Sequence, residues 1–104
     1  MLINIDPILG PEVLHTLRAM GHGDKLILCD SNFPAYSMNS VVHRLDGVDA
    51  AKAAKAILSI FPLDSFIEFP ILRMQIDNKP DELNDVHKEI IDVTRSVAGE
   101  NWKI

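Results

Sequence analysis

Apolar residues recur at helical spacing in three stretches of the chain. The first, residues 11–20, begins with a proline, which suits the first position of a helix because its missing N–H has no partner there. Asp49 can cap a second helix, from 50 to about 61, which is rich in alanine and is followed by a proline. The third covers residues 83–97 and ends before Gly99. The pattern therefore predicts three helices.

Between the helices lie stretches with the composition of β-strands. Residues 25–30 include four consecutive apolar residues, as in a strand buried on both faces, and residues 41–45 form a second candidate. Residues 65–76 look extended, although an internal proline restricts them to an edge strand or a bulge, and a last strand begins at Trp102. This order predicts a single domain, residues 1–104, with an α/β fold: a sandwich of a mixed β-sheet and flanking helices.

Charge and composition exclude several classes of partner and location. The formal net charge is −5 and the 10 basic residues are scattered, so no cationic surface for nucleic acid is predicted. The first residues lack the features of a signal peptide, and no apolar run approaches the roughly 20 residues that span a bilayer. We therefore expect a cytoplasmic protein without a membrane partner, suited to small neutral molecules.

The segment Gly21-His22-Gly23-Asp24 carries the most informative chemistry. Two glycines leave the backbone around His22 open, so that a ligand can approach the imidazole. An imidazole ordinarily titrates near pH ~6.5 and can both accept and donate a proton in the cell. Asp24 is close enough in sequence to support the ring. The alternative is that the glycines serve a helix-to-strand turn and that the histidine is simply exposed.

Asp30 and Asn32 follow the predicted buried strand. The carboxyl ends of strands are where α/β proteins favour ligand sites, and these two side chains can form hydrogen bonds with sugar hydroxyls. Asp and Asn also often satisfy the amides of a turn, so both interpretations of the pair stay open.

The other candidates for chemistry are weaker. His15, His43 and His87 have no partners at metal-ligand spacing, so no metal site is predicted. Cys29 is the single cysteine, which rules out an internal disulfide, and we expect it to act as a small apolar residue inside its strand.

Four short segments occur in a recognisable order along the chain. They are Met20-Gly21-His22-Gly23-Asp24, Asp30-Ser31-Asn32-Phe33-Pro34-Ala35, Arg44-Leu45-Asp46-Gly47 and Phe61-Pro62-Leu63-Asp64. Together they resemble the fucose mutarotase and ribose pyranase family, over nearly the whole sequence. The Asn-Phe-Pro triplet within the second segment favours the fucose mutarotase branch.

The resemblance implies a cytoplasmic isomerase, a mutarotase that interconverts the α and β anomers of a monosaccharide such as L-fucose by general acid–base ring opening. His22 matches the family's catalytic histidine, and Asp30 matches a sugar-binding aspartate. The family needs no metal or organic cofactor. Its subunits form homo-oligomeric rings with sugar sites at the subunit boundaries.

The spacing of these two residues restricts how they can share a sugar. If residues 25–29 are extended, they separate His22 from Asp30 by ~16 Å. Either the histidine turn curls back toward the aspartate, or neighbouring subunits supply one residue each.

The family domain continues beyond the third helix into strands that bear a basic or imidazole ligand and a Tyr-x-Asn sugar-binding segment. This sequence ends at Ile104, and its single tyrosine, Tyr36, does not match that segment. We therefore expect a mutarotase-like domain without the family's C-terminal strands. The alternative to an enzyme is a non-catalytic sugar-binding or structural ring subunit derived from this family.

Overall fold

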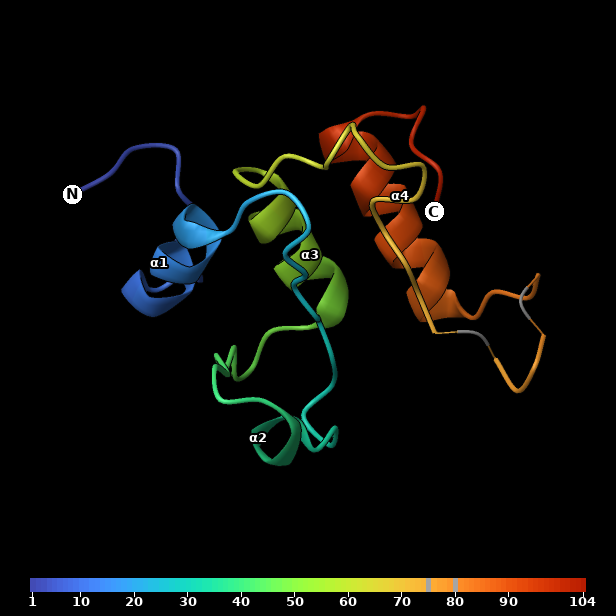
Figure 1. Ribbon diagram of the computed structural model, residues 1–104, viewed down its shortest axis with the longest axis horizontal. Coiled ribbons are helices and arrows are strands. Elements are labelled where there is room, and N and C mark those ends of the chain that lie inside the picture. The colour runs from blue at the N-terminus through green and yellow to red at the C-terminus, as the bar shows by residue number, and fades with distance from the viewer. Residues whose placement is uncertain (75, 80) are drawn as a thin grey trace.

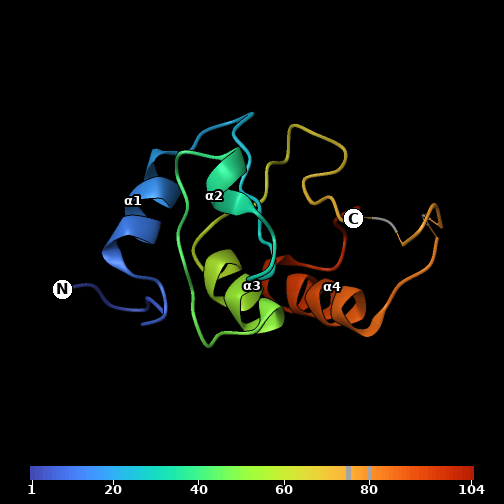
Figure 2. The same ribbon diagram turned by 90° about the horizontal axis from the view of Figure 1, so that it is seen from below.

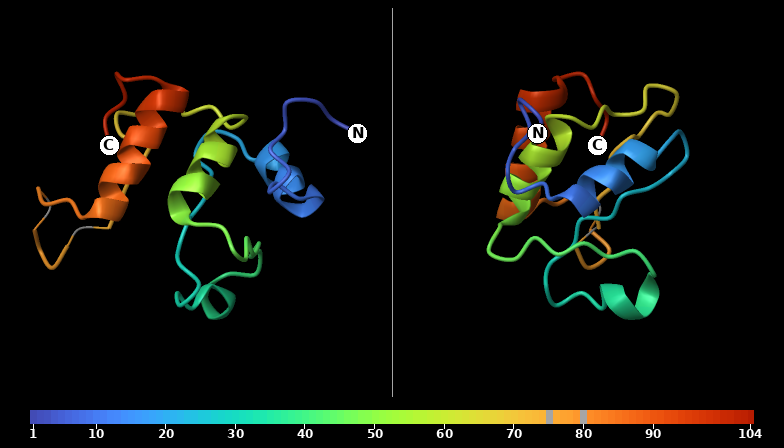
Figure 3. Two further views of the ribbon diagram at one scale, coloured as in Figure 1. Left: turned by 180° about the vertical axis from the view of Figure 1, so that it is seen from behind. Right: turned by 90° about the vertical axis from the view of Figure 1, so that its left-hand side faces the viewer.

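A computed structural model of the chain describes residues 1–74, 76–79 and 81–104, and three longer helices in this part form a row (Figure 1). Helix α1 spans Pro11–Ala19, α3 spans Ala50–Leu58 and α4 spans Asp85–Ala98, with α3 between the other two. The three predicted helices are thus confirmed. A further single turn, α2 (Ala35–Met38), was not predicted and lies apart from the row (Figure 3).

The starts of the helices follow their capping chemistry. Pro11 is the first residue of α1. The side chain of Asp49 accepts a hydrogen bond from the Lys52 N–H at 2.8 Å, which begins α3 as predicted. At α4, Asn84 accepts from the His87 N–H at 2.8 Å, and the His87 ring accepts from the Asn84 N–H at 3.3 Å. His87 therefore has a structural role, because its side chain and backbone take part in the reciprocal cap of α4.

The main apolar core joins α1 to α3. Its buried side chains come from α1, from the residue before its cap, and from the second half of α3: Val13, Leu17, Leu9, Ala56 and Ile57. Ala56 on α3 is only 1% exposed, so this side of α3 is fully covered.

Helix α3 also packs against α4 on its other side (Figure 2). Two alanines of α3, Ala53 and Ala54, are buried, and Thr94 of α4 is completely buried. The Thr94 hydroxyl donates to the Ile90 carbonyl at 2.7 Å, so this buried polar group is satisfied within its own helix. The middle helix is therefore covered on both sides.

The predicted sandwich with a mixed β-sheet is wrong. Among the described residues the β-type pairing is a single isolated antiparallel bridge between Ile76 and Lys79. The predicted strands at 25–30 and 41–45 have no ladder of backbone hydrogen bonds. Gln75, in the third predicted strand, lies outside the described residues.

The physical reason for this error is that an apolar run does not specify a pairing partner. A strand becomes part of a sheet only when a neighbouring backbone satisfies its N–H and C=O groups. Ile27, in the middle of the first run, is 67% exposed, whereas the sequence predicted burial on both faces. Cys29 is exposed as well, so its predicted role as an interior residue is also wrong.

The chain consequently exposes a large surface for its mass. Its solvent-accessible area is 8228 Å², whereas a compact monomer of the same mass exposes about 5,800 Å². Its radius of gyration is 14.0 Å, against about 13 Å for a compact chain of about 100 residues. Within the described part, no helix is both long and apolar enough to cross a membrane.

Candidate functional site

The predicted catalytic histidine lies in a tight turn directly after α1. The Gly21 N–H donates to the Asp24 side chain at 2.8 Å, and the Asp24 N–H donates back to the Gly21 carbonyl at 3.1 Å. Gly23 has a φ of 89°, which L side chains rarely adopt, so the turn needs a glycine there. Asp24 was predicted to support the His22 ring, and the hydrogen bonds that it forms are with the Gly21 backbone of the turn. The His22 side chain is 70% exposed.

Two residues that lie far along the chain contact the imidazole. The Nδ1 atom of His22 is 3.1 Å from Oδ1 of Asp64, whose side chain is only 21% exposed. The ring of Phe66 meets the imidazole edge to face, with centroids 4.8 Å apart and planes at 72°. The segment after α3 therefore supports the turn after α1.

The pKa of the Asp64 carboxyl group is lowered by its surroundings. Its Oδ1 accepts a hydrogen bond from the Phe66 N–H at 2.9 Å. That N–H holds the pKa of the carboxyl below its usual range, and the hydrogen bond from His22 acts in the same direction, while partial desolvation opposes both. Asp64 is therefore an ionised hydrogen-bond acceptor beside the histidine.

Sequence reasoning did not assign a role to Asp64. The residue stood in one of the four family-like segments, but nothing in its local spacing pointed to His22, which lies 42 positions earlier. The available signal was the segment order itself: a carboxylate in a family-like segment that had no assigned function.

The predicted sugar-binding residues occupy a separate loop between α1 and α2. Oδ1 of Asp30 accepts from the Asn32 N–H at 2.8 Å and from the Phe33 N–H at 3.1 Å. This is the turn-forming role that the sequence left open. A carboxylate offers about four acceptor sites on two oxygens, so the same side chain retains capacity for a ligand. Both Asp30 and Asn32 are exposed.

The structure does not bring the two parts of the predicted site into direct contact. In the ranges that the structure describes, no hydrogen bond or ion pair joins His22 or Asp64 to Asp30 or Asn32. The segment that follows α1 passes α3 and continues to α2, away from the row of three helices (Figure 1). The His22 turn and the Asp30 loop are therefore described as two separate groups of residues.

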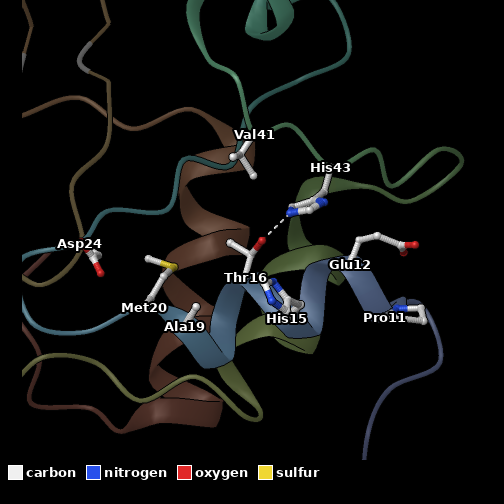
Figure 4. A pocket seen from close by; sticks show the side chains of 9 residues that line it. All are labelled: Pro11, Glu12, His15, Thr16, Ala19, Met20, Asp24, Val41 and His43. Carbon is white, nitrogen blue, oxygen red and sulfur yellow. Dashed lines mark hydrogen bonds between the residues drawn. The ribbon is translucent and has the colours of Figure 1, made fainter.

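A shallow groove of about 660 Å³ lies along α1 (Figure 4). It includes Asp24 but not His22, Asp30 or Asn32. Its lining is mostly apolar, and its polar link is a 2.7 Å hydrogen bond between the Thr16 hydroxyl and the His43 Nε2. That bond fastens the segment after α2 to α1.

A second hollow of about 400 Å³ adjoins this groove through Glu12 and His43. Neither hollow contains the predicted site residues apart from Asp24. In the described residues, no group of three or more His, Cys, Asp or Glu side chains is arranged to hold a metal ion.

Comparison with known proteins gives matches over most of the chain. Residues 3–103 match the model of a family described as the RbsD / FucU transport protein family. The L-fucose mutarotase of Actinobacillus pleuropneumoniae serotype 5b (strain L20) is 44% identical over 75 residues, which cover 72% of this chain and 52% of the relative. The L-fucose mutarotase of Haemophilus influenzae (strain PittEE) is 43% identical with the same coverage. The chain thus spans about half the length of these curated relatives.

A solved structure follows the same path. The crystal structure of protein Atu2016, described as a candidate sugar binding protein, has a TM-score of 0.83 and 42% sequence identity to this chain. The match covers 100% of this chain and 72% of the other. The path of the backbone over this chain is therefore shared with a solved protein.

Proposed function

Because the chain belongs to the RbsD / FucU family, we propose that it is a monosaccharide mutarotase that interconverts the α and β anomers of a sugar such as L-fucose. The observation that carries this proposal is an imidazole that is 70% exposed in a glycine turn, in a chain 44% identical to a protein named L-fucose mutarotase. An exposed imidazole can reach a sugar hydroxyl and exchange a proton with it near neutral pH.

The proposed reaction moves one proton and needs no redox step. His22 takes the proton of the anomeric hydroxyl, and the electron pair left on that oxygen forms the carbonyl of the open-chain aldehyde. The bond between the anomeric carbon and the ring oxygen breaks, and the ring oxygen receives the proton from the imidazolium. Closure on the other face of the carbonyl reverses these steps. Acid–base assistance of this kind is worth roughly 10²–10⁴-fold in rate.

Asp30 and Asn32 would hold the sugar hydroxyls in this proposal. Both side chains are exposed, and Asp30 keeps free acceptor capacity beyond its two turn amides. Since they do not contact His22 within one chain, the proposal includes a homo-oligomer in which neighbouring copies complete each site.

The exposed surface supports assembly. The chain exposes roughly 2,400 Å² more than a compact monomer of its mass, and a standard protein–protein interface covers about 800 Å² on each partner. Part of this additional exposed surface is apolar, because Leu26, Ile27 and Leu28 in the segment 25–30 are exposed. The predicted cytoplasmic location stays a prediction.

The test is saturation-transfer NMR on L-fucose, with D-ribose and D-galactose as comparison sugars. We expect the protein to accelerate anomer exchange and His22→Ala to lower that acceleration by about 10²–10⁴-fold. His15→Ala is the matched control, because His15 is an exposed histidine of α1 outside the proposed site. Exchange by His22→Ala at the unsubstituted rate would contradict the assignment of the histidine.

The second candidate function is a non-catalytic sugar-binding or structural ring subunit. The observation that favours it is that, in the described residues, no hydrogen bond or ion pair links His22 to Asp30 or Asn32. Line broadening of L-fucose signals without faster exchange would support a binding subunit. A large assembled mass with neither binding nor exchange would support a structural one.

A further inference from the structure

The His22 ring is held on two sides although most of it is exposed. An exposed side chain ordinarily samples several rotamers, and fixing it costs conformational entropy. Here Nδ1 meets the Asp64 carboxylate at 3.1 Å, and the Phe66 ring lies edge to face at 4.8 Å. Together these contacts restrict both the position and the rotation of the imidazole.

Asp64 is itself anchored in a way that suits this task. The oxygen that faces His22 also accepts the backbone N–H of Phe66 at 2.9 Å. The carboxylate thus cannot turn away without losing a hydrogen bond to the backbone. Its side chain is 21% exposed, compared with 70% for the histidine, so the anchor is the more sheltered member of the pair.

The chemistry of the pair determines which ring nitrogen carries the proton. An ionised carboxylate only accepts hydrogen bonds, so the Nδ1 atom that faces it must be the donor. In the neutral imidazole, the other nitrogen, Nε2, then has a free lone pair. In metal sites, partners that fix the orientation and tautomer of a histidine typically change affinity or activity by about 10–100-fold when they are removed.

We propose that Asp64 is a positioning residue that holds His22 as the Nδ1–H tautomer, so that Nε2 is the atom that takes the proton of the anomeric hydroxyl and returns it to the ring oxygen. This inference rests on the proposed mutarotase function. Phe66 contributes its N–H to the carboxylate and its ring edge to the imidazole.

The test measures the tautomer and the reaction separately. Long-range ¹H–¹⁵N NMR of the neutral imidazole should show His22 protonated at Nδ1. In Asp64→Ala the signal should move toward the Nε2–H tautomer that a free imidazole side chain prefers. The rate of anomer exchange at saturating sugar should fall by about 10–100-fold.

Two further variants distinguish a positioning role of Asp64 from an effect on folding and from an effect of its charge alone. Asp64→Asn keeps an oxygen for the Phe66 N–H, so its loop should stay folded, while the neutral amide should give a mixture of tautomers and an intermediate rate. Asp92→Asn removes the same charge from an exposed position of α4 and should change neither readout.

The outcomes distinguish this inference from the proposal on which it rests. An unchanged Nδ1–H signal in Asp64→Ala, with exchange at the unsubstituted rate, overturns the positioning role. If the unsubstituted protein accelerates no sugar but the tautomer still switches in Asp64→Ala, the mutarotase function fails, while the hold of Asp64 on the ring stands.

Discussion

The α1–α3 core and the segment at 25–30 contain the same kinds of side chain in opposite surroundings. Ile57 on α3 is 8% exposed, while Ile27 in the extended segment is 67% exposed. Leu17 on α1 is 7% exposed, and Leu28 is 42% exposed. The helical residues find their partners within the chain, whereas the extended ones do not.

The difference follows from what each kind of element needs. A helix satisfies its interior backbone internally and has only to bury one face, which α1 and α3 do against each other. An extended segment must find a second backbone as well as an apolar surface. Local sequence can therefore specify a helix with one apolar face, but it cannot specify which backbone will pair with an extended segment.

The largest predicted effect tests the buried side of this comparison. Ile57→Ala removes a side chain from the α1–α3 core and leaves a cavity that the packed helices fill only in part. We expect the free energy of unfolding to fall by about 2–5 kcal/mol. Urea denaturation followed by far-UV circular dichroism measures the loss.

Ile27→Ala is the matched substitution on the exposed side. In dilute protein its free energy of unfolding should change by less than about 0.5 kcal/mol, because the side chain is mostly in water already. In concentrated protein the same variant should form less of the assembled species, measured by light scattering. A loss of stability equal to that of Ile57→Ala would mean that the comparison between the two regions is mistaken.

A smaller effect concerns how α3 begins. Asp49→Ala removes the side-chain acceptor for the Lys52 N–H and should cost about 1 kcal/mol of unfolding free energy. Asp49→Asn restores an acceptor without the charge and should recover most of the loss. If both variants lose equal stability, the charge rather than the hydrogen bond begins the helix.

The fold was predictable where the chemistry is local. The caps at Asp49 and Pro11 are sequence signals that act within one turn, and both helices start where those residues predicted. The sheet was not predictable, because the apolar run around Ile27 indicates a preference for burial and cannot identify the backbone that would pair with it.

The candidate site divides in the same way. The glycine turn that presents His22 could be predicted from its own four residues, and its closure by Asp24 is local. The contact with Asp64 could not, because it depends on how the chain after α3 returns to the end of α1. The proposed roles of His22 and Asp30 rest on the family resemblance, whereas that of Asn32 rests on its position beside Asp30 after the predicted strand.

The smallest predicted effect compares how the apolar core and the segment with Asp64 and Phe66 respond to acid. The folded pKa of Asp64 lies below its ordinary value of 3.8, so its ionised form stabilises the fold fully above that value. This stabilisation declines as the pH falls below 3.8 and through the lowered folded pKa.

The Phe66 N–H, which donates to the Asp64 carboxylate, should therefore shift in NMR spectra as the pH falls through this range. The Ile57 N–H should shift much less, because the core cluster around Ile57 consists of apolar residues, which do not titrate. Shifts of equal size at both amides would show that acid loosens the whole chain at once, and the polar and apolar regions would then behave as one unit.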